Sequence, residues 1–203
     1  IFTNTIFEHL KSPNIGSSGL TASITIYDTE ASFEKCIFDQ NQSEDFLNLI
    51  HSKYEISDSY FKFAQSDAVD SDYSNGTILN SIFTDIGNDA LDFSGSISEL
   101  SKLSFDGVGD KVLSAGEMSK ISGKHIDIIN AEIGITSKDL SEVSISDLKI
   151  KDTRLGFAVF QKKEEYGAGQ ATITGLEMTN VDFVHLVDLN STLTLNGTDV
   201  ISK

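Results

Sequence analysis

The chain has 203 residues, of which 39% are hydrophobic, and a formal charge of −16 at neutral pH. This size allows a substantial core, and the acidic balance argues against a nucleic-acid partner, which needs a basic face. No apolar run approaches the roughly 20 residues that cross a bilayer, so no membrane insertion is expected. The single cysteine, Cys36, excludes an intrachain disulfide, and its apolar neighbours predict a small buried side chain.

The chain opens on Ile1, without a methionine, a charged segment or a signal-like segment. We therefore interpret residues 1–203 as a single domain that is a fragment of a longer protein, with further domains of the same chain among its expected partners. An acidic surface suits solubility, divalent cations and an extracellular setting. A secreted or cell-surface location is expected.

Apolar residues recur every 22 positions, and a fixed period of this length is typical of stacked repeats. The series is Leu47, Val69, Leu91, Leu113, Ile135 and Phe157. Alternations such as Leu91-x-Phe93 have the period of a strand rather than of a helix. Strands this short bury their inward side chains only by stacking on the next coil. The pattern therefore predicts an all-β fold, a single-stranded right-handed parallel β-helix of about eight coils of about 22 residues. A leucine-rich repeat would need a helical arm and a recurring Leu-x-x-Leu-x-Leu core, and neither is found.

Pairs of apolar residues five positions apart run in phase with this series and predict a bend in every coil. The pairs are Phe2/Phe7, Phe33/Phe38, Ile56/Phe61, Ile78/Phe83, Leu100/Phe105, Ile121/Ile126, Ile145/Ile150, Ile173/Met178 and Leu195/Val200. Two places after the first member from the second pair onward stand Lys35, Asp58, Asn80, Lys102, Gly123, Asp147, Gly175 and Gly197. Most of these are Asn, Asp or Gly, which tolerate a left-handed backbone. The phenylalanines of these pairs are expected to form an internal stack.

Two breaks in the period predict inserted loops, near residues 8–22 and 162–169. The first is rich in Ser, Gly and Asn and contains the only proline, which is typical of an exposed turn. Loops inserted into a repeat often lie on its working face. The second loop leaves from the strand that carries the 22-residue series, so we expect it beside any functional site.

Stacking at about 4.8 Å per coil places two outward columns of polar residues on this strand. The columns are Asp45, Asp67, Asp89 and Lys111, and Asn48, Asp70, Asp92 and Ser114. Carboxylates this close repel one another, which raises their pKa values or recruits a hard cation. We therefore predict a Ca²⁺ site formed by Asp67, Asp70, Asp89, Asp92 and Asp110. The alternative is a solvated acidic face that keeps a long sheet soluble.

Basic and aromatic residues follow the acidic ones along the same predicted face. In β-eliminating polysaccharide chemistry a cation neutralises the uronate carboxylate while a Lys or Arg removes the α-proton. The candidate catalytic residues are Lys111, Lys138 and Arg154. The candidate substrate-binding residues are Tyr73, Glu117, Asp139, Lys162, Lys163 and Tyr166. The four histidines share no column, so no histidine metal cluster is predicted.

Residues 87–96, 109–117, 133–139 and 161–163 resemble bacterial right-handed parallel β-helix repeat proteins of the pectate-lyase-like superfold, of the surface or secreted type. The resemblance implies the fold; activity varies in this superfamily, which includes lyases, epimerases, phage tailspikes and adhesins. Pro13 is the sole proline, so the Asp-Pro-His signature of alginate-type epimerases is absent, and no catalytic residue transfers by motif. The expected function is binding of an extended, acidic polysaccharide along one face. The sequence leaves open whether Ca²⁺ assists and whether the glycan is cleaved as by a lyase. The alternative is a non-catalytic rod or adhesin segment.

Overall fold

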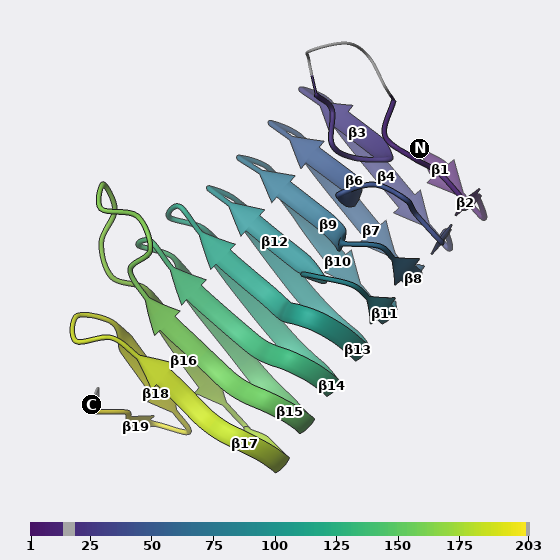
Figure 1. The fold of residues 1–203 in the computed structure, drawn as a ribbon. Coiled ribbons are helices and arrows are strands. Elements are labelled where there is room, and N and C mark those ends of the chain that lie inside the picture. The colour runs from purple at the N-terminus through teal and green to yellow at the C-terminus, as the bar shows by residue number, and fades with distance from the viewer. Residues whose placement is uncertain (14–18, 202–203) are drawn as a thin grey trace.

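The structure is a computed structural model that describes residues 1–13 and 19–201. Its described residues form strands and turns and no helix, so they include no helical segment that could span a membrane. The strands stack in parallel as about eight coils with a 22-residue spacing (Figure 1). The predicted fold class, a parallel β-helix, is confirmed.

Each coil contributes a strand or a part of a strand to three faces. The first face contains β1 (Phe2–Thr3), β4 (Glu30–Glu34), β7 (Lys53–Ser57), β10 (Asn75–Leu79), β16 (Gln170–Thr174) and β18 (Thr192–Leu195). The second contains β2 (Ile6–Glu8), β5 (Ile37–Asp39), β8 (Tyr60–Ala64) and β11 (Ile82–Ile86), and the third β3 (Ile24–Tyr27), β6 (Asp45–Ile50), β9 (Asp67–Asp72) and β12 (Leu91–Ser94). The long strands β13 (Ile97–Gly116), β14 (Lys120–Lys138) and β15 (Glu142–Phe160) bend across all three faces, and β17 (Glu177–Val187) crosses the second and third.

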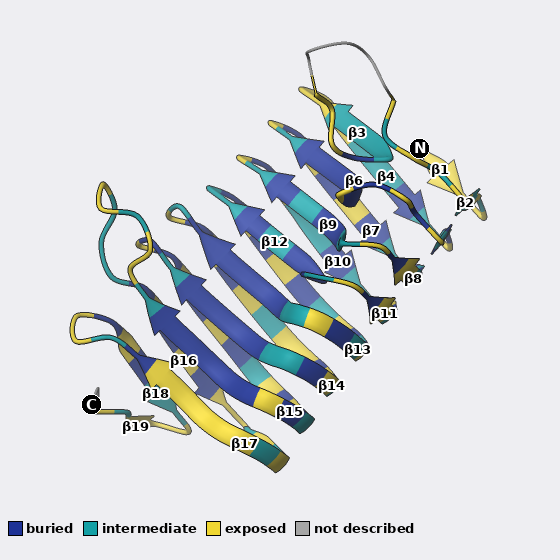
Figure 2. Ribbon diagram, in the orientation of Figure 1, coloured by how far each residue is buried: buried dark blue, intermediate teal, exposed yellow. Residues whose placement is uncertain are grey.

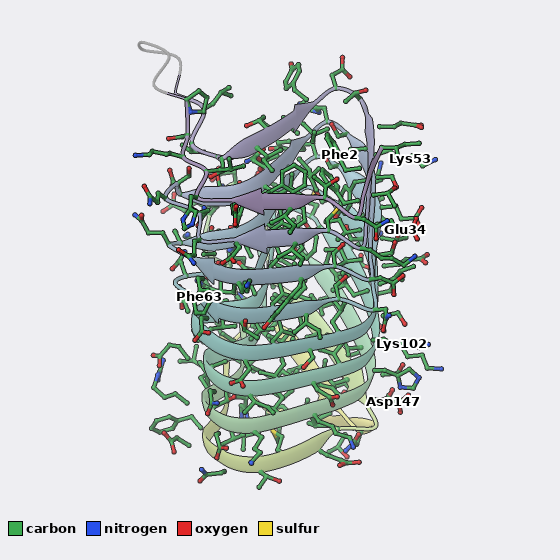
Figure 3. The ribbon with its side chains drawn as sticks, turned by 90° about the vertical axis from the view of Figure 1, so that its right-hand side faces the viewer. Phe2, Glu34, Lys53, Phe63, Lys102 and Asp147 are labelled. Carbon is green, nitrogen blue, oxygen red and sulfur yellow. The ribbon has the colours of Figure 1, made fainter. Side chains whose placement is uncertain are left out.

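The core consists of columns of apolar side chains inside the coil. Leu91 pairs in register with Val69 on one side and Leu113 on the other, and all six residues of the predicted 22-residue series are buried. Phenylalanine rings stack in a second column, with centroid separations of 4.1 Å for Phe38 and Phe61 and 4.8 Å for Phe61 and Phe83. Side chains fill the interior between the walls (Figure 3). Stacking of identical positions therefore builds the core, as the period predicts.

Left-handed residues turn the chain at the corners, as predicted, with one error of register. Seven of the eight predicted positions have positive φ, from 46° at Asn80 to 79° at Gly197. Gly123 does not; it lies opposite Leu100 and Ile145, and the left-handed residue of its coil is His125, with φ of 55°. The apolar pair of this coil is therefore Gly123/Ile128 rather than Ile121/Ile126. The glycine hid the register because the Ile126 side chain fills its place: a Cβ on Gly123 would lie 2.9 Å from Ile126 Cδ1.

Buried serines add a column of hydrogen bonds between coils that the sequence analysis missed. The backbone N–H of Ser52 donates to Ser74 Oγ at 2.8 Å, and that of Ser74 donates to Ser96 Oγ at 3.0 Å. Ser119 and Ser141 continue the series. Each hydroxyl satisfies a corner amide that no strand ladder can reach, so the serines hold the corner between the third and first faces.

The inserted loops and the C-terminal end complete the description of the stack. Part of the predicted loop at 8–22, residues 14–18, lies outside the described residues. The second loop connects β15 to β16. At the C-terminal end, β19 (Thr198–Asp199) turns back antiparallel to β18, whereas β17 is largely exposed (Figure 2), with Phe183 at 60%.

Candidate functional site

The outward side of the third face carries the predicted polar columns in register. Asp70 pairs with Asn48 and Asp92, and Ser114 pairs with Asp92 and Thr136. Ala158 follows Thr136, and in the neighbouring column Ile133 and Leu155 follow Lys111. Along the stack the face is therefore acidic first, then rich in lysine and hydroxyl groups, then apolar. The predicted basic end was wrong in this respect, because small and apolar side chains occupy the last coils.

Two of the predicted metal ligands bind the backbone of the next coil. Asp67 Oδ1 accepts hydrogen bonds from Asn88 Nδ2 at 2.6 Å and from the Asp89 amide at 3.0 Å. Asp89 Oδ1 accepts one from the Lys111 amide at 3.0 Å. Asp45 and Asp89 are each only 4% exposed, so these two members of the acidic column are not solvated. These aspartates tie successive coils together at the corner of the face.

Asp70 lies partly buried among several other carboxylates. Asn48 Nδ2 donates to Asp70 Oδ2 at 2.7 Å and to Asp72 Oδ2 at 3.3 Å. Burial, reinforced by Asp72 and the neighbouring aspartates, raises the pKa of Asp70 to about 9. The side chain is therefore protonated near neutral pH. Burial also raises the pKa of Asp45 to about 6, and it does the same at Asp89, where Lys111 opposes the shift.

The predicted Ca²⁺ site stays a prediction. Among the described residues, no three His, Cys, Asp or Glu side chains are arranged to hold a metal. Asp110 lies against Lys111, and Asp67 and Asp89 bind backbone amides. The buried oxygens of the polar column without a hydrogen-bond partner are Asn48 Oδ1, Asp92 Oδ1 and Thr136 Oγ1. Of the five predicted ligands, only Asp92 therefore contributes a buried oxygen without a hydrogen-bond partner, and Asn48 offers another in the same column.

The three predicted catalytic residues do not converge. Lys111 Nζ lies 3.2 Å from Asp89 Oδ1, and Lys138 Nζ donates to Ser114 Oγ at 2.7 Å. Arg154 pairs with Glu132 at the start of the third-face segment, whereas Lys138 stands at its end. Lys138 is the basic residue that lies over the polar column.

The predicted substrate-binding residues do come together, at the corner where the second inserted loop leaves. Tyr73 Oη donates to Glu117 Oε2 at 2.9 Å, and the Lys163 ammonium contacts the other oxygen of the same carboxylate. The Lys163 hydrogen bond lowers the pKa of Glu117. Asp139 Oδ1 accepts the backbone N–H groups of Lys162 and Lys163, both at 2.7 Å. Tyr166 is half-buried in this loop. Asp139 thus anchors the loop beside the third face.

The Tyr73 ring lies between His51 and Gly95 of the neighbouring coils, which limits the ring surface free to stack on a sugar. Its ring stacks on His51 with a centroid separation of 5.5 Å and an interplanar angle of 16°. On the other side, the ring occupies the space of a side chain at Gly95, whose Cβ would lie 2.5 Å from Tyr73 Cδ1. Tyr73 as a whole is 51% exposed. The histidine stack was missed because His51 falls one coil before Tyr73 at a corner that the sequence analysis did not recognise.

Comparisons with known proteins leave the family open. No protein-family model and no curated protein matches the chain. The chain is similar to solved structures of the catalytic domain of a GH87 alpha-1,3-glucanase in complex with nigerose, with a TM-score of 0.44 and 11% identity over 83% of this chain and 49% of that one. Two variants of that domain, also with nigerose, give TM-scores of 0.44 and 0.42 at 11% identity, over 79% of this chain and 48% of theirs. The chain spans about half the length of these domains.

Proposed function

We propose that this β-helix binds an extended polysaccharide along the outward side of its third face. The observation that carries the proposal is the in-register column of Asn48, Asp70, Asp92, Ser114 and Thr136. Its repeat of about 4.8 Å places polar side chains in a line that a linear chain of hydroxyl-bearing rings can follow, and Asp70 and Asp92 are its partly exposed members. The loop after β15 supplies one wall through Lys163 and Tyr166. A secreted or cell-surface location fits this role.

The charge of the face limits which glycan it accepts. Each lysine near the column already faces a carboxylate: Lys111 faces Asp89, Lys138 faces Asp92, and Lys163 faces Glu117. An acidic glycan therefore meets net repulsion unless a cation such as Ca²⁺ lies between the two sets of carboxylates. We accordingly expect neutral oligosaccharides to bind without Ca²⁺ and polyuronates to require it.

Cleavage of a bound uronan by β-elimination would depend on Lys138. Ca²⁺ would neutralise the uronate carboxylate in such a reaction. Lys138 is the basic side chain over the column, and it lies 2.7 Å from Ser114 Oγ. Unsaturated product, read by ultraviolet absorbance across a panel of polyuronates, tests this activity, and loss of the signal in Lys138→Met is expected.

Isothermal titration with oligosaccharides of α-1,3-glucose, β-1,4-glucose, β-1,4-mannose and α-1,4-galacturonic acid, in EDTA and in millimolar Ca²⁺, tests binding. Binding of at least one is expected, with Asp70→Asn/Asp92→Asn weakening it. The matched control is Asp127→Asn, an exposed aspartate of β14 on the second face. Ca²⁺ alone should raise the melting temperature, because a ligand that binds only the folded state stabilises it by mass action. If no oligosaccharide of the panel binds, the result would instead favour the non-catalytic rod or adhesin segment.

A further inference from the structure

We propose that Asp92, Ser114, Thr136 and Lys138 form a subsite that takes two hydroxyl groups of a bound glycan. The inference rests on the proposed polysaccharide-binding function and assigns its central contact. The four residues come from three adjacent coils: Asp92 from β12, Ser114 from β13, and Thr136 and Lys138 from β14. Ser114 pairs directly with both Asp92 and Thr136. The subsite lies where the face changes from acidic to apolar.

The Lys138 side chain reaches this position because of a glycine. A Cβ at Gly116 would lie 2.9 Å from Lys138 Cε. With no side chain there, Lys138 lies flat across β13, and its ammonium sits 2.7 Å from Ser114 Oγ and 4.0 Å from Asp92 Oδ1. Its side chain is only 12% exposed. A lysine held along the sheet in this way is positioned for binding rather than extended into solvent.

The polar groups of the subsite are incompletely satisfied within the protein. Thr136 has no exposed surface, and its hydroxyl has no hydrogen-bond partner. Asp92 Oδ1 is also buried without a partner. Most buried polar atoms in folded proteins have partners, because an unmade hydrogen bond costs free energy. The two unmade bonds lie in one column, on either side of Ser114, which points to a ligand that completes them.

Two hydroxyl groups of the glycan, one on each side of Ser114, supply the missing groups. Each hydroxyl donates one hydrogen bond and accepts up to two, an ammonium only donates, and a carboxylate only accepts. One sugar hydroxyl can donate to Asp92 Oδ1 while it accepts from the Lys138 ammonium. Thr136 is fully buried in the free protein, so the second hydroxyl reaches it only when the side chains over it move on binding. The contact uses no net charge and therefore serves neutral and acidic glycans alike.

The test measures affinity and stability in the same variants. Thr136→Val keeps the shape of the side chain and removes its hydroxyl, so it should raise the melting temperature. It should also lower the affinity for the tightest-binding oligosaccharide of the titration panel by about fivefold or more. The control is Thr153→Val: Thr153 is a buried threonine of β15 whose hydroxyl donates to Lys151 O at 3.0 Å. That variant should lose stability and keep its affinity. Asp92→Asn and Lys138→Met should each weaken binding about tenfold or more.

The outcomes separate this proposal from the function on which it rests. If wild type binds an oligosaccharide and all three subsite variants bind it equally well, the proposed function stands and the subsite is refuted. If wild type binds none of the panel, the function fails and the subsite with it. A mono-O-methylated form of the bound sugar provides a second readout. Blocking the relevant hydroxyl should weaken wild type strongly and Thr136→Val much less.

Discussion

Replacement of Asp70 by asparagine should stabilise the protein at neutral pH. In the folded chain burial among Asp72 and other aspartates raises the pKa of this carboxyl from 3.8 to about 9. The unfolded chain releases the proton above pH 4, whereas the folded chain keeps it. Stability therefore falls as pH rises between these two values, by about 1.4 kcal/mol per pH unit at most. An asparagine side chain at this position has no such proton to release and avoids the loss.

The magnitude follows from the width of this window. At pH 7.5 the difference of more than three pH units corresponds to at most about 5 kcal/mol, and relaxation around the site reduces it. For a chain of this length a gain of a few kcal/mol raises the melting temperature by about 5–15 °C. The amide preserves the contact with Asn48, since its oxygen can accept the hydrogen bond that Asp70 Oδ2 now accepts at 2.7 Å.

Thermal unfolding followed by circular dichroism between pH 3.5 and 8.5 in EDTA checks the prediction. The gain of Asp70→Asn over wild type should be close to zero at pH 3.5 and grow steadily with pH. The exposed control Asp127→Asn should show no such growth. A gain for Asp70→Asn that is the same at every pH, or a loss at pH 7.5, would refute the buried, protonated state of Asp70.

Three further predictions concern the stack and its loop. Phe83→Ala should lower the free energy of unfolding by about 3–5 kcal/mol, because the ring is fully buried and stacks on a ring on each side. The half-exposed Phe63 (Figure 3) should tolerate alanine, and urea unfolding compares the two variants. Gly87→Ala should lower the melting temperature, since its Cβ would lie 2.2 Å from a backbone oxygen, and Gly19→Ala, with nothing within 4 Å, should not. Asp139→Ala should speed hydrogen exchange at the two loop amides that donate to Asp139, measured by mass spectrometry. Unchanged exchange would show that the loop conformation does not depend on Asp139.

The 22-residue period predicted the fold because each inward position has the same partners above and below it. Residues such as Leu91 and Leu113 are buried, so these positions are apolar in every coil and the period is visible in the sequence. The error at Gly123 shows the limit of this reading: a neighbouring isoleucine can fill an inward position from elsewhere in the coil. The serine column also repeats every 22 or 23 residues and could have been found by searching for a polar period.

The candidate site was predictable in part. The period places Asp70, Asp92 and Ser114 in one column, but it does not predict how deeply each side chain is buried or which way it points. That Asp67 and Asp89 bind backbone amides, and that Lys138 turns back across β13, depend on side-chain geometry. The glycine at 116, one coil before Lys138, is the sequence signal that could have indicated a lysine lying flat.

The acidic side chains of the third face lower the stability of the fold, but they lie on the outside of the coil, where a ligand can bind. A stack held by apolar columns would be more stable with apolar or amide side chains at Asp70, since a buried carboxyl with raised pKa destabilises the fold at neutral pH. Apolar residues do occupy this face in the later coils, Ala158 in the column of Asp70 and Ile133 and Leu155 in the column of Lys111, so the architecture tolerates them. Unsatisfied and like-charged groups concentrated on one stretch of one face are expected where binding, rather than folding, selects the side chain. The pH-dependent gain from Asp70→Asn and the opposite changes in stability and affinity from Thr136→Val test this argument on two independent residues of the same column.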